Sequence, residues 1–323
     1  MPQAVVLREP GPPSVLKVEP IEVGQPAAGQ VRLRQTFVGV NFHDCYVRSG
    51  LYQTLPLPGI PGLEAVGIVE AVGDGVSTLK PGDHVAYLTR AYGGYASDRL
   101  INADMVVRIP GGLEDRTIAA TFLRGLTAQM LVYDVFPVRA GHTVLVHAAA
   151  GGVGRLLCQL AKHLGATVIG TAGSEAKAGL ARASGCDHTI LYRSENFVDR
   201  VRELTNGRGV DVAYDSVGKD TFQGSLESLA VRGHLANFGQ SSGPIAPFLI
   251  SQLFAKSNSL SRPAVFHYFD GKDREPMAQR LFSALSARII TADDCHEYAF
   301  ADAAQAHEDL EARKTTGAVL LKV

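Results

Sequence analysis

Hydrophobic runs alternate with amphipathic stretches from about residue 124 onward. Predicted strands cover 143–149, 166–172, 188–192, 210–218 and 233–240, and predicted helices cover 153–165, 174–185, 196–207 and 219–233. Nearly continuous apolar strands that alternate with helices are typical of a parallel sheet covered on both faces. The pattern therefore predicts a doubly wound α/β domain over residues 124–265.

Residues 1–100 show a different pattern, in which short segments rich in β-branched residues are interrupted by glycine and proline. Interruptions at about 8–12 residues are typical of an all-β barrel or sandwich. The segments 73–75 (Gly-Asp-Gly) and 81–83 (Pro-Gly-Asp) favour tight turns between strands.

The alternation of strands and helices ends at about Pro263. Beyond it, the chain predicts helices over 273–288 and 301–314 and a last strand over 317–323. A lone strand needs a sheet edge to join, so we expect this tail to return to the first domain. The predicted domains are therefore 1–123 together with 266–323, and 124–265.

The composition is that of an ordinary globular protein, since the 323 residues carry a net charge of −1 and 46% of them are hydrophobic. This balance argues against a polyanion binder and a disordered chain. The four cysteines (Cys45, Cys158, Cys186 and Cys295) form no C-x-x-C pair, which argues against a disulfide framework and a zinc knuckle. No apolar stretch reaches about 18 residues, so we expect a cytoplasmic protein without a membrane anchor.

Glycine is over-represented, with 34 residues where average usage predicts roughly 23. Some of the surplus lies in HAAAGGVG (147–154), between a predicted strand and a predicted helix, which is the context that the G-x-G-x-x-G fingerprint requires. Alanine replaces the first glycine of the fingerprint. Such turns let the backbone approach a pyrophosphate at a helix N-terminus; the alternative is a tight turn that binds nothing. The predicted dinucleotide contacts here are Ala149, Gly151, Gly152, Val153 and Gly154.

The choice of dinucleotide is expected to depend on residues about 20 positions further on, where an NAD enzyme places an acid. The strand 166–172 is followed by Gly173 and Ser174, with no acid at its end. Ser174 is a predicted N-cap, which puts Lys177 in the first helical turn, where a cation opposes the helix dipole. A 2′-phosphate would explain this cation, with Tyr192 covering the adenosine. We expect NADPH rather than NADH; the alternative is a solvated surface lysine.

Several segments together, among them GVNFHDCYVRSGLY, GLEAVGIVEAVG, PGDHVAY, LRGLTAQML, HAAAGGVG and YDSVG, resemble the zinc-independent quinone oxidoreductases. These are relatives of zeta-crystallin within the medium-chain dehydrogenase/reductase superfamily. The resemblance covers essentially the whole chain. It implies a GroES-like β-barrel catalytic domain, a Rossmann domain that binds NADPH, and a homodimer formed through the edge strand 259–266.

The resemblance also indicates whether this chain has the ligands for a zinc ion. Zinc alcohol dehydrogenases of this superfamily have a cysteine in the first motif, where this chain has Asn41, and a His-Glu pair in the second, where it has Leu63 and Glu64. The four-cysteine lobe is missing because no cysteine lies between Cys45 and Cys158. We therefore expect no metal. Hydride transfer to an electrophilic quinone or alkene then remains feasible through positioning of the nicotinamide.

Further site residues follow from the resemblance alone. It implies that Asn41 and Tyr46 lie near the nicotinamide and that Tyr52 faces the substrate, to which it could donate a hydrogen bond or a proton. Asn41 and Tyr52 are the expected catalytic residues, although Tyr52 could simply pack its ring. The other implied cofactor contacts are Thr127, Ser216, Phe238, Gly239, Ser241 and Arg313. The candidate pocket residues are His43, Tyr52, Arg124 and Arg262.

The leading hypothesis is an NADPH-dependent quinone oxidoreductase that acts on small quinones. The main alternative is an NADPH-dependent alkene reductase for enones, enoyl compounds or acrylates, in which Arg124 or Arg262 could bind a carboxylate. The resemblance also includes relatives with structural or RNA-binding roles. Nucleic-acid binding needs a basic surface, and a net charge of −1 argues against it.

Overall fold

The computed structural model describes residues 1–292 and 294–323. The chain forms two compact units. Unit 1 comprises Met1–Leu123, Phe269–Ser286 and Ala292–Val323, and unit 2 comprises Arg124–Tyr268 and Ala287–Thr291. The predicted boundary at 265/266 lies slightly before the corresponding boundary of unit 2.

Unit 2 contains a six-stranded sheet of order β10-β9-β8-β11-β12-β13, in which all pairs are parallel. Its strands are β8 (Thr143–Val146), β9 (Thr167–Ala172), β10 (His188–Leu191), β11 (Val210–Asp215), β12 (Leu229–Asn237) and β13 (Ser259–Ser261). The strand order reverses between β8 and β11. In such sheets, ligands bind outside the carboxyl ends of the strands at this reversal. The predicted doubly wound domain is therefore confirmed.

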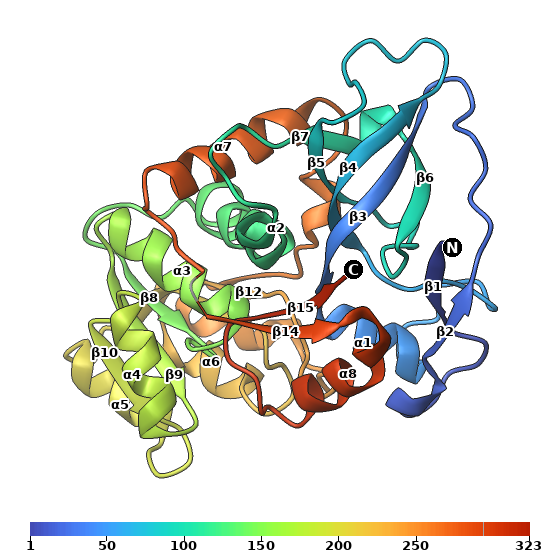
Figure 1. Ribbon diagram of the computed structural model, residues 1–323. Helices are drawn as coiled ribbons and strands as arrows, with labels where there is room; N and C mark the ends of the chain where they lie inside the picture. The colour runs from blue at the N-terminus through green and yellow to red at the C-terminus, as the bar shows by residue number, and fades with distance from the viewer. Residues whose placement is uncertain (293) are drawn as a thin grey trace. The chain divides into compact units, whose positions relative to one another are not determined.

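The helices of unit 2 cover both faces of this sheet. They are α3 (Gly152–His163), α4 (Glu175–Ala183), α5 (Phe197–Leu204) and α6 (Phe222–Ser228), and they are labelled in Figure 1. Helix α3 packs against α4, and α5 packs against α6. Because crossovers between parallel strands are right-handed, the reversal puts these two pairs on opposite faces. A core that includes Leu145, Ile169, Val201 and Leu226 joins the sheet to α5 and α6.

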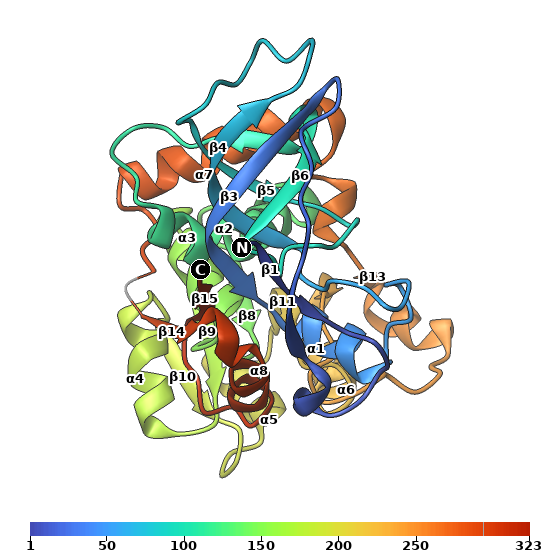
Figure 2. The same cartoon turned by 45° about the vertical axis from the view of Figure 1, so that its right-hand side comes forward.

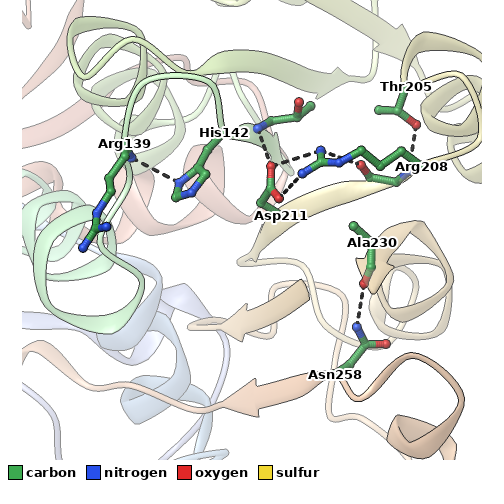
Figure 3. A network of polar contacts seen from close by, with 9 residues as sticks. Arg139, His142, Thr205, Arg208, Asp211, Ala230 and Asn258 are labelled. Atoms are coloured by element: carbon green, nitrogen blue, oxygen red, sulfur yellow. Dashed lines mark hydrogen bonds and ion pairs between the residues drawn. The ribbon is translucent and has the colours of Figure 1, made fainter. Parts of the chain in front are cut away.

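Polar contacts hold the amino ends of β8 and β11 together (Figure 3). The carboxylate of Asp211 accepts a hydrogen bond from the backbone N–H of Thr143 at 2.7 Å, and it also binds the guanidinium of Arg208. Nearby, His142 accepts the backbone N–H of Arg139 at 3.1 Å. This network lies at the end of the sheet opposite the carboxyl ends, where parallel sheets bind ligands.

Unit 1 is built on a seven-stranded sheet of order β14-β15-β3-β4-β5-β7, with β6 paired to β3 (Figure 1). These strands are β3 (Gln30–Val40), β4 (Glu64–Val72), β5 (His84–Leu88), β6 (Asp98–Asn102), β7 (Val106–Arg108), β14 (Cys295–Ala299) and β15 (Ala318–Lys322). Strands β1 (Gln3–Val6) and β2 (Lys17–Pro20) form a separate antiparallel pair. Strand β15 pairs antiparallel with β3, so the tail returns to the first domain as predicted.

Unit 1 also carries helices α1 (Phe42–Ser49), α7 (Arg274–Ser286) and α8 (Ala303–Glu311), and the chain passes from unit 1 to unit 2 within α2 (Asp115–Gln129). Figure 2 shows α1 and α8 from a second direction. The short helices are η1 (Pro13–Val15), η2 (Ala103–Met105), the π-helix η3 (Met130–Val135), η4 (Ile250–Lys256), η5 (Val265–His267), η6 (Gly271–Asp273) and η7 (Phe300–Asp302). Over the described part of the chain, no helix is both long and apolar enough to cross a membrane.

Helix α1 interrupts a region for which the sequence predicted only strands and turns. Its first turn is closed by the side chain of Asp44, which accepts the backbone N–H of Asn41 at 2.8 Å. The helix ends at Gly50, whose φ of 83° is the left-handed conformation that glycine adopts without strain. These two local signals fix a short helix whose first residues include several predicted site residues.

All four cysteines are free thiols. The fold nevertheless brings together two that are separated in sequence, because the Sγ atoms of Cys158 and Cys186 lie 3.3 Å apart in the core of unit 2. The hydrogen bond with the neighbouring thiol of Cys186, together with burial, raises the pKa of Cys158 well above its ordinary value. The Cys158 thiol is therefore protonated at neutral pH, and the two buried side chains pack against each other.

Candidate active site

The turn between β8 and α3 has the geometry of an anion-binding loop. Ala148 has a φ of 51°, and Gly151 is the N-cap of α3. A Cβ atom added to Gly154 would lie 2.2 Å from the carbonyl oxygen of Ala148, so this position accepts only glycine. The first N–H groups of α3 have no acceptor within the helix, and they lie at the carboxyl end of β8. The predicted residues Ala149, Gly151, Gly152, Val153 and Gly154 thus form one continuous turn.

The end of β9 holds the residues predicted to select the dinucleotide. The Ser174 hydroxyl caps α4 by accepting the backbone N–H of Lys177 at 3.4 Å. A Cβ atom on Gly173 would lie 2.7 Å from the phenol oxygen of Tyr192, so the two predicted residues are in direct proximity. Glu175, which follows the cap, is paired with Arg182 on the same helix. This ion pair offsets the acidic charge that would otherwise oppose an anion beside Lys177.

The predicted nicotinamide-side residues lie on two loops that follow β11 and β12. The backbone N–H of Ser241 donates to the carbonyl of Ser216 at 3.2 Å, which joins the loops. A Cβ atom on Gly239 would lie 2.6 Å from the same carbonyl oxygen, so glycine permits this close approach. The backbone N–H of Phe238 donates to Asp215 at 2.8 Å. Ser216, Phe238, Gly239 and Ser241 therefore belong to one hydrogen-bonded surface of unit 2.

Arg262, predicted as a pocket residue, is hydrogen-bonded to this surface. Its Nη1 atom donates to the carbonyl oxygens of Asn237 at 3.1 Å and of Gly239 at 2.9 Å, and to the Asn237 side chain at 2.5 Å. One guanidinium nitrogen is therefore engaged with three oxygens of the protein. The two remaining predicted residues of unit 2, Arg124 and Thr127, are buried in the last turns of α2, with 6% and 8% exposure.

In unit 1, Asn41 is held by a buried carboxylate. Its side-chain amide donates to Glu64 Oε1 at 2.8 Å, and the backbone N–H of Leu123 donates to Glu64 Oε2 at 2.8 Å. Glu64 is 1% exposed. A Cβ atom on Gly39 would lie 2.1 Å from Glu64 Oε1, so glycine leaves the room that the carboxylate occupies. Glu64 was not among the site residues predicted from the sequence. The available signal was an acidic residue directly after the apolar Leu63, at the start of a strand.

Aromatic side chains gather around α1. The ring of Tyr52 lies edge-on to His43 at 5.3 Å and to Tyr46 at 5.1 Å between centroids. The Nε2 atom of His43 lies 3.1 Å from the phenol oxygen of Tyr92, which also bonds the hydroxyl of Thr54. Burial lowers the pKa of His43 to about 4, so the imidazole is neutral at pH 7.

Tyr92 was not predicted from the sequence. It is 5% exposed and has a φ of 57°, an unusual conformation for a residue with a Cβ atom. Its only sequence signal was its place in the turn segment AYGGY. Arg313, the remaining predicted cofactor contact, is an exposed residue just after α8, with a φ of 57°.

Cys45 lies on α1 but does not join a metal-binding cluster. Its Sγ atom lies 3.6 Å from His307 Nδ1, while His307 Nε2 lies 2.8 Å from the Tyr95 phenol oxygen. Burial raises the pKa of the Cys45 thiol. Among residues 1–292 and 294–323, no three His, Cys, Asp or Glu side chains come together as a metal site would require.

Two family models match this chain and define its class of protein. Residues 27–111 match the model of the alcohol dehydrogenase GroES-like domain, and residues 152–283 match that of the zinc-binding dehydrogenases. Together with the parallel sheet of unit 2, these matches define a medium-chain dehydrogenase/reductase, with a GroES-like domain and a Rossmann domain.

Relatives over nearly the whole chain define the family. The chain is 42% identical to a quinone oxidoreductase of Pseudomonas aeruginosa and 40% identical to a 2-haloacrylate reductase of Burkholderia sp., covering 96% and 99% of each chain. It also resembles the crystal structure of Escherichia coli quinone oxidoreductase complexed with NADPH, with a TM-score of 0.96 and 38% identity over 99% of this chain and 100% of that chain. The protein belongs to the zeta-crystallin-like quinone oxidoreductase family.

Proposed function

We propose that the protein is an NADPH-dependent quinone oxidoreductase that works without a metal. The observation that carries the proposal is the glycine-containing turn 148–154 at the carboxyl end of β8, in a chain whose relatives include quinone oxidoreductases over nearly their whole length. The two units are assigned as the catalytic domain (unit 1) and the cofactor-binding domain (unit 2).

The residues of unit 2 fit a dinucleotide phosphate. The turn offers helix N–H groups to the pyrophosphate, and Gly154 and Gly239 are positions where a Cβ atom would collide with backbone. Lys177 supplies a cation beside the cap of α4, where the 2′-phosphate would lie, and Tyr192 flanks Gly173. The assigned contacts in unit 2 are Thr127, Ala149, Gly151, Gly152, Val153, Gly154, Gly173, Ser174, Lys177, Tyr192, Ser216, Phe238, Gly239 and Ser241; those in unit 1 are Asn41, Tyr46 and Arg313.

When bound, NADPH supplies a hydride, and reduction of a quinone to a hydroquinone needs two electrons and two protons in total. The hydride provides both electrons and one proton, so one more proton must reach an oxygen atom of the product. The Tyr52 phenol is assigned as its donor, oriented by edge-on contacts with His43 and Tyr46. Asn41 is assigned to orient the reacting carbonyl, and Glu64 holds its amide in place.

The alternative substrate is an activated alkene with a carboxylate, because a 2-haloacrylate reductase is 40% identical to this chain. Such a substrate needs a cation. The Nη1 atom of Arg262 binds three protein oxygens, and Arg124, which is 6% exposed, is the other candidate for this role. His43 is neutral at pH 7 and would supply a hydrogen bond without a charge.

Oxidation of NADPH, followed at 340 nm, separates the two substrates when small quinones are compared with enones and acrylates. We expect faster turnover of a quinone. Strong turnover of an acrylate without quinone activity would reverse the order, and Arg124→Met should then raise KM for the acrylate and leave KM for a neutral enone unchanged. No turnover of any acceptor, in a protein that binds NADPH, would contradict an oxidoreductase function.

A homodimer and a cytoplasmic location are further parts of the proposal. Strand β13 is at the end of the sheet of unit 2 (Figure 2), and the nearby side chains Ile250 and Phe254 are 74% and 87% exposed. Pairing of β13 with a second copy would complete this edge and cover these apolar groups. A monomer in sedimentation velocity at micromolar concentration would contradict the dimer. The four free thiols are typical of a reducing compartment.

A further inference from the structure

His147 is a buried polar residue that the proposed reaction does not use. It directly follows β8, is 1% exposed, and lies at the entrance to the phosphate turn. Its Nδ1 atom lies 3.2 Å from the hydroxyl of Thr171 on β9, and its Nε2 atom lies 2.9 Å from the hydroxyl of Ser225 on α6. The ring packs edge-on to Phe197 on α5, with centroids 4.9 Å apart. One side chain thus joins β8 to elements on both sides of it.

The hydrogen bonds around the imidazole fix its tautomer. The Ser225 hydroxyl donates its single proton in a hydrogen bond to the carbonyl of Thr221 at 2.8 Å, so its oxygen accepts a hydrogen bond from the imidazole Nε2–H. The Nδ1 atom is then an acceptor, and the Thr171 hydroxyl donates to it. That hydroxyl oxygen also accepts the backbone N–H of Ala148, the first residue of the turn, at 3.3 Å. The donor and the acceptor of each hydrogen bond made by the Thr171 and Ser225 hydroxyls are therefore defined.

The same chain extends to the loop on the nicotinamide side. The Ser225 hydroxyl lies 3.5 Å from Asp215 Oδ2 at the end of β11. The other carboxylate oxygen accepts the backbone N–H groups of Val217 at 2.8 Å and Gly218 at 3.0 Å, together with the Thr221 hydroxyl at 2.8 Å. The carboxylate shapes the loop that begins with Ser216. The imidazole is therefore connected through Thr171 to the phosphate turn, and through Ser225 and Thr221 to the carboxylate that shapes this loop.

We propose that His147 is a positioning residue that holds the phosphate turn 148–154 and the loop 215–218 in fixed relation, so that both halves of the dinucleotide site are set before the cofactor binds. The inference rests on the proposed dinucleotide binding. A residue that is 1% exposed has no access to substrate, so His147 acts through the two loops and takes no part in proton transfer to the product. Burial lowers its pKa and the charge of Asp215 raises it, with burial as the larger cause, which keeps the ring neutral and both hydrogen bonds in place.

The test compares His147→Phe with wild type. Phenylalanine keeps a ring against Phe197 but removes both hydrogen bonds. We expect the Kd for NADPH, measured by fluorescence titration, to rise about tenfold, which corresponds to about 1.4 kcal/mol. The Kd for 2′,5′-ADP, a fragment without the nicotinamide, should rise less because it does not span both loops. Amide hydrogen exchange of 148–154 and 215–218 should become faster in the cofactor-free protein.

Asp211→Asn is the matched control, because it loosens the same two strands, β8 and β11, at their opposite ends (Figure 3). It should lower the melting temperature without changing the Kd for NADPH or the exchange of the two loops. Ser225→Ala removes a single hydroxyl and should raise the Kd about threefold, which keeps the test available if His147→Phe does not fold.

Two results would overturn the inference. One is a folded His147→Phe protein whose Kd and loop exchange equal those of wild type; the other is an equal effect of Asp211→Asn on the same measurements, which would mean a general loss of stability. A wild-type protein that fails to bind NADPH would instead contradict the proposed function. In that case the exchange measurement on the free protein still decides whether His147 holds the loops.

Discussion

Replacement of His307 should change how the stability of the protein depends on pH. The side chain is completely buried between Cys45 and Tyr95, and burial, with a smaller contribution from the charge of Arg48, lowers its pKa to about 3. In the unfolded chain the pKa is about 6.5. Below pH 6.5 the His307 imidazole therefore binds a proton in the unfolded chain but not in the folded protein. The free energy of unfolding falls as the pH is lowered from about 6.5 to about 3.

The magnitude follows from these two pKa values. At about 1.4 kcal/mol for each pKa unit, the full effect is about 5 kcal/mol as an upper bound, of which about 2 kcal/mol is already lost at pH 5. His307→Phe removes the titrating group and keeps a ring beside Tyr95. It should be less stable than wild type at pH 7 by about 1–3 kcal/mol, because the hydrogen bond between the Tyr95 hydroxyl and the imidazole is lost. The gap should shrink by about 2 kcal/mol at pH 5.

Urea denaturation followed by circular dichroism at pH 7 and pH 5 measures this gap. Tyr95→Phe, which removes the same hydrogen bond but keeps the buried imidazole, is the control and should lower stability while keeping the pH dependence of wild type. A gap between wild type and His307→Phe that stays constant from pH 7 to pH 5 would refute the reasoning. So would an NMR titration that gives His307 in the folded protein an ordinary pKa.

Three further predictions concern the candidate site. Lys177→Ala should reduce the preference for NADPH over NADH about tenfold, because it removes one charged contact to the 2′-phosphate; an unchanged ratio of the two Kd values would contradict the assignment. Glu64→Gln places an amide donor against either the Asn41 amide or the Leu123 backbone N–H. The melting temperature should fall, and kcat should drop about tenfold as Asn41 loses its fixed orientation. Full activity would mean that this orientation is unimportant. Tyr52→Phe should lower kcat for a quinone about tenfold at unchanged KM; equal kcat values would assign the proton to solvent.

Long periodic segments made the fold of unit 2 predictable from the sequence. The predicted helix 153–165 is α3 (Gly152–His163), and the predicted strand 166–172 is β9 (Thr167–Ala172). The errors lie at the ends of predicted strands and helices, because tertiary contacts determine where these elements end. The predicted strand 143–149 stops at Val146 because the chain enters the turn 148–154, and the predicted helix 219–233 stops at Ser228 because the next residues pair with β11.

Other features depend on contacts that are distant in sequence. Strand β14 (Cys295–Ala299) was missed because five residues without clear alternation become a strand only through pairing with β15. The predicted strand 259–266 forms only over Ser259–Ser261, since Pro263 cannot donate to a ladder. For the candidate site, the sequence supplied the turn and the aromatic residues of α1. It could not show that Glu64 would reach Asn41, or that Tyr92 would reach His43.

The position of β15 bears on how the protein is made. This strand lies between β14 and β3 in the sheet of unit 1, yet it follows all of unit 2 along the chain. During synthesis, the nascent chain therefore exposes an edge of β3 until after the whole of unit 2 has left the ribosome. Unit 2, whose sheet comes from one nearly continuous stretch, can fold in the meantime. Unit 1 begins first in the sequence and is completed last, so an incompletely translated chain would contain a folded unit 2 and an open, aggregation-prone sheet in unit 1.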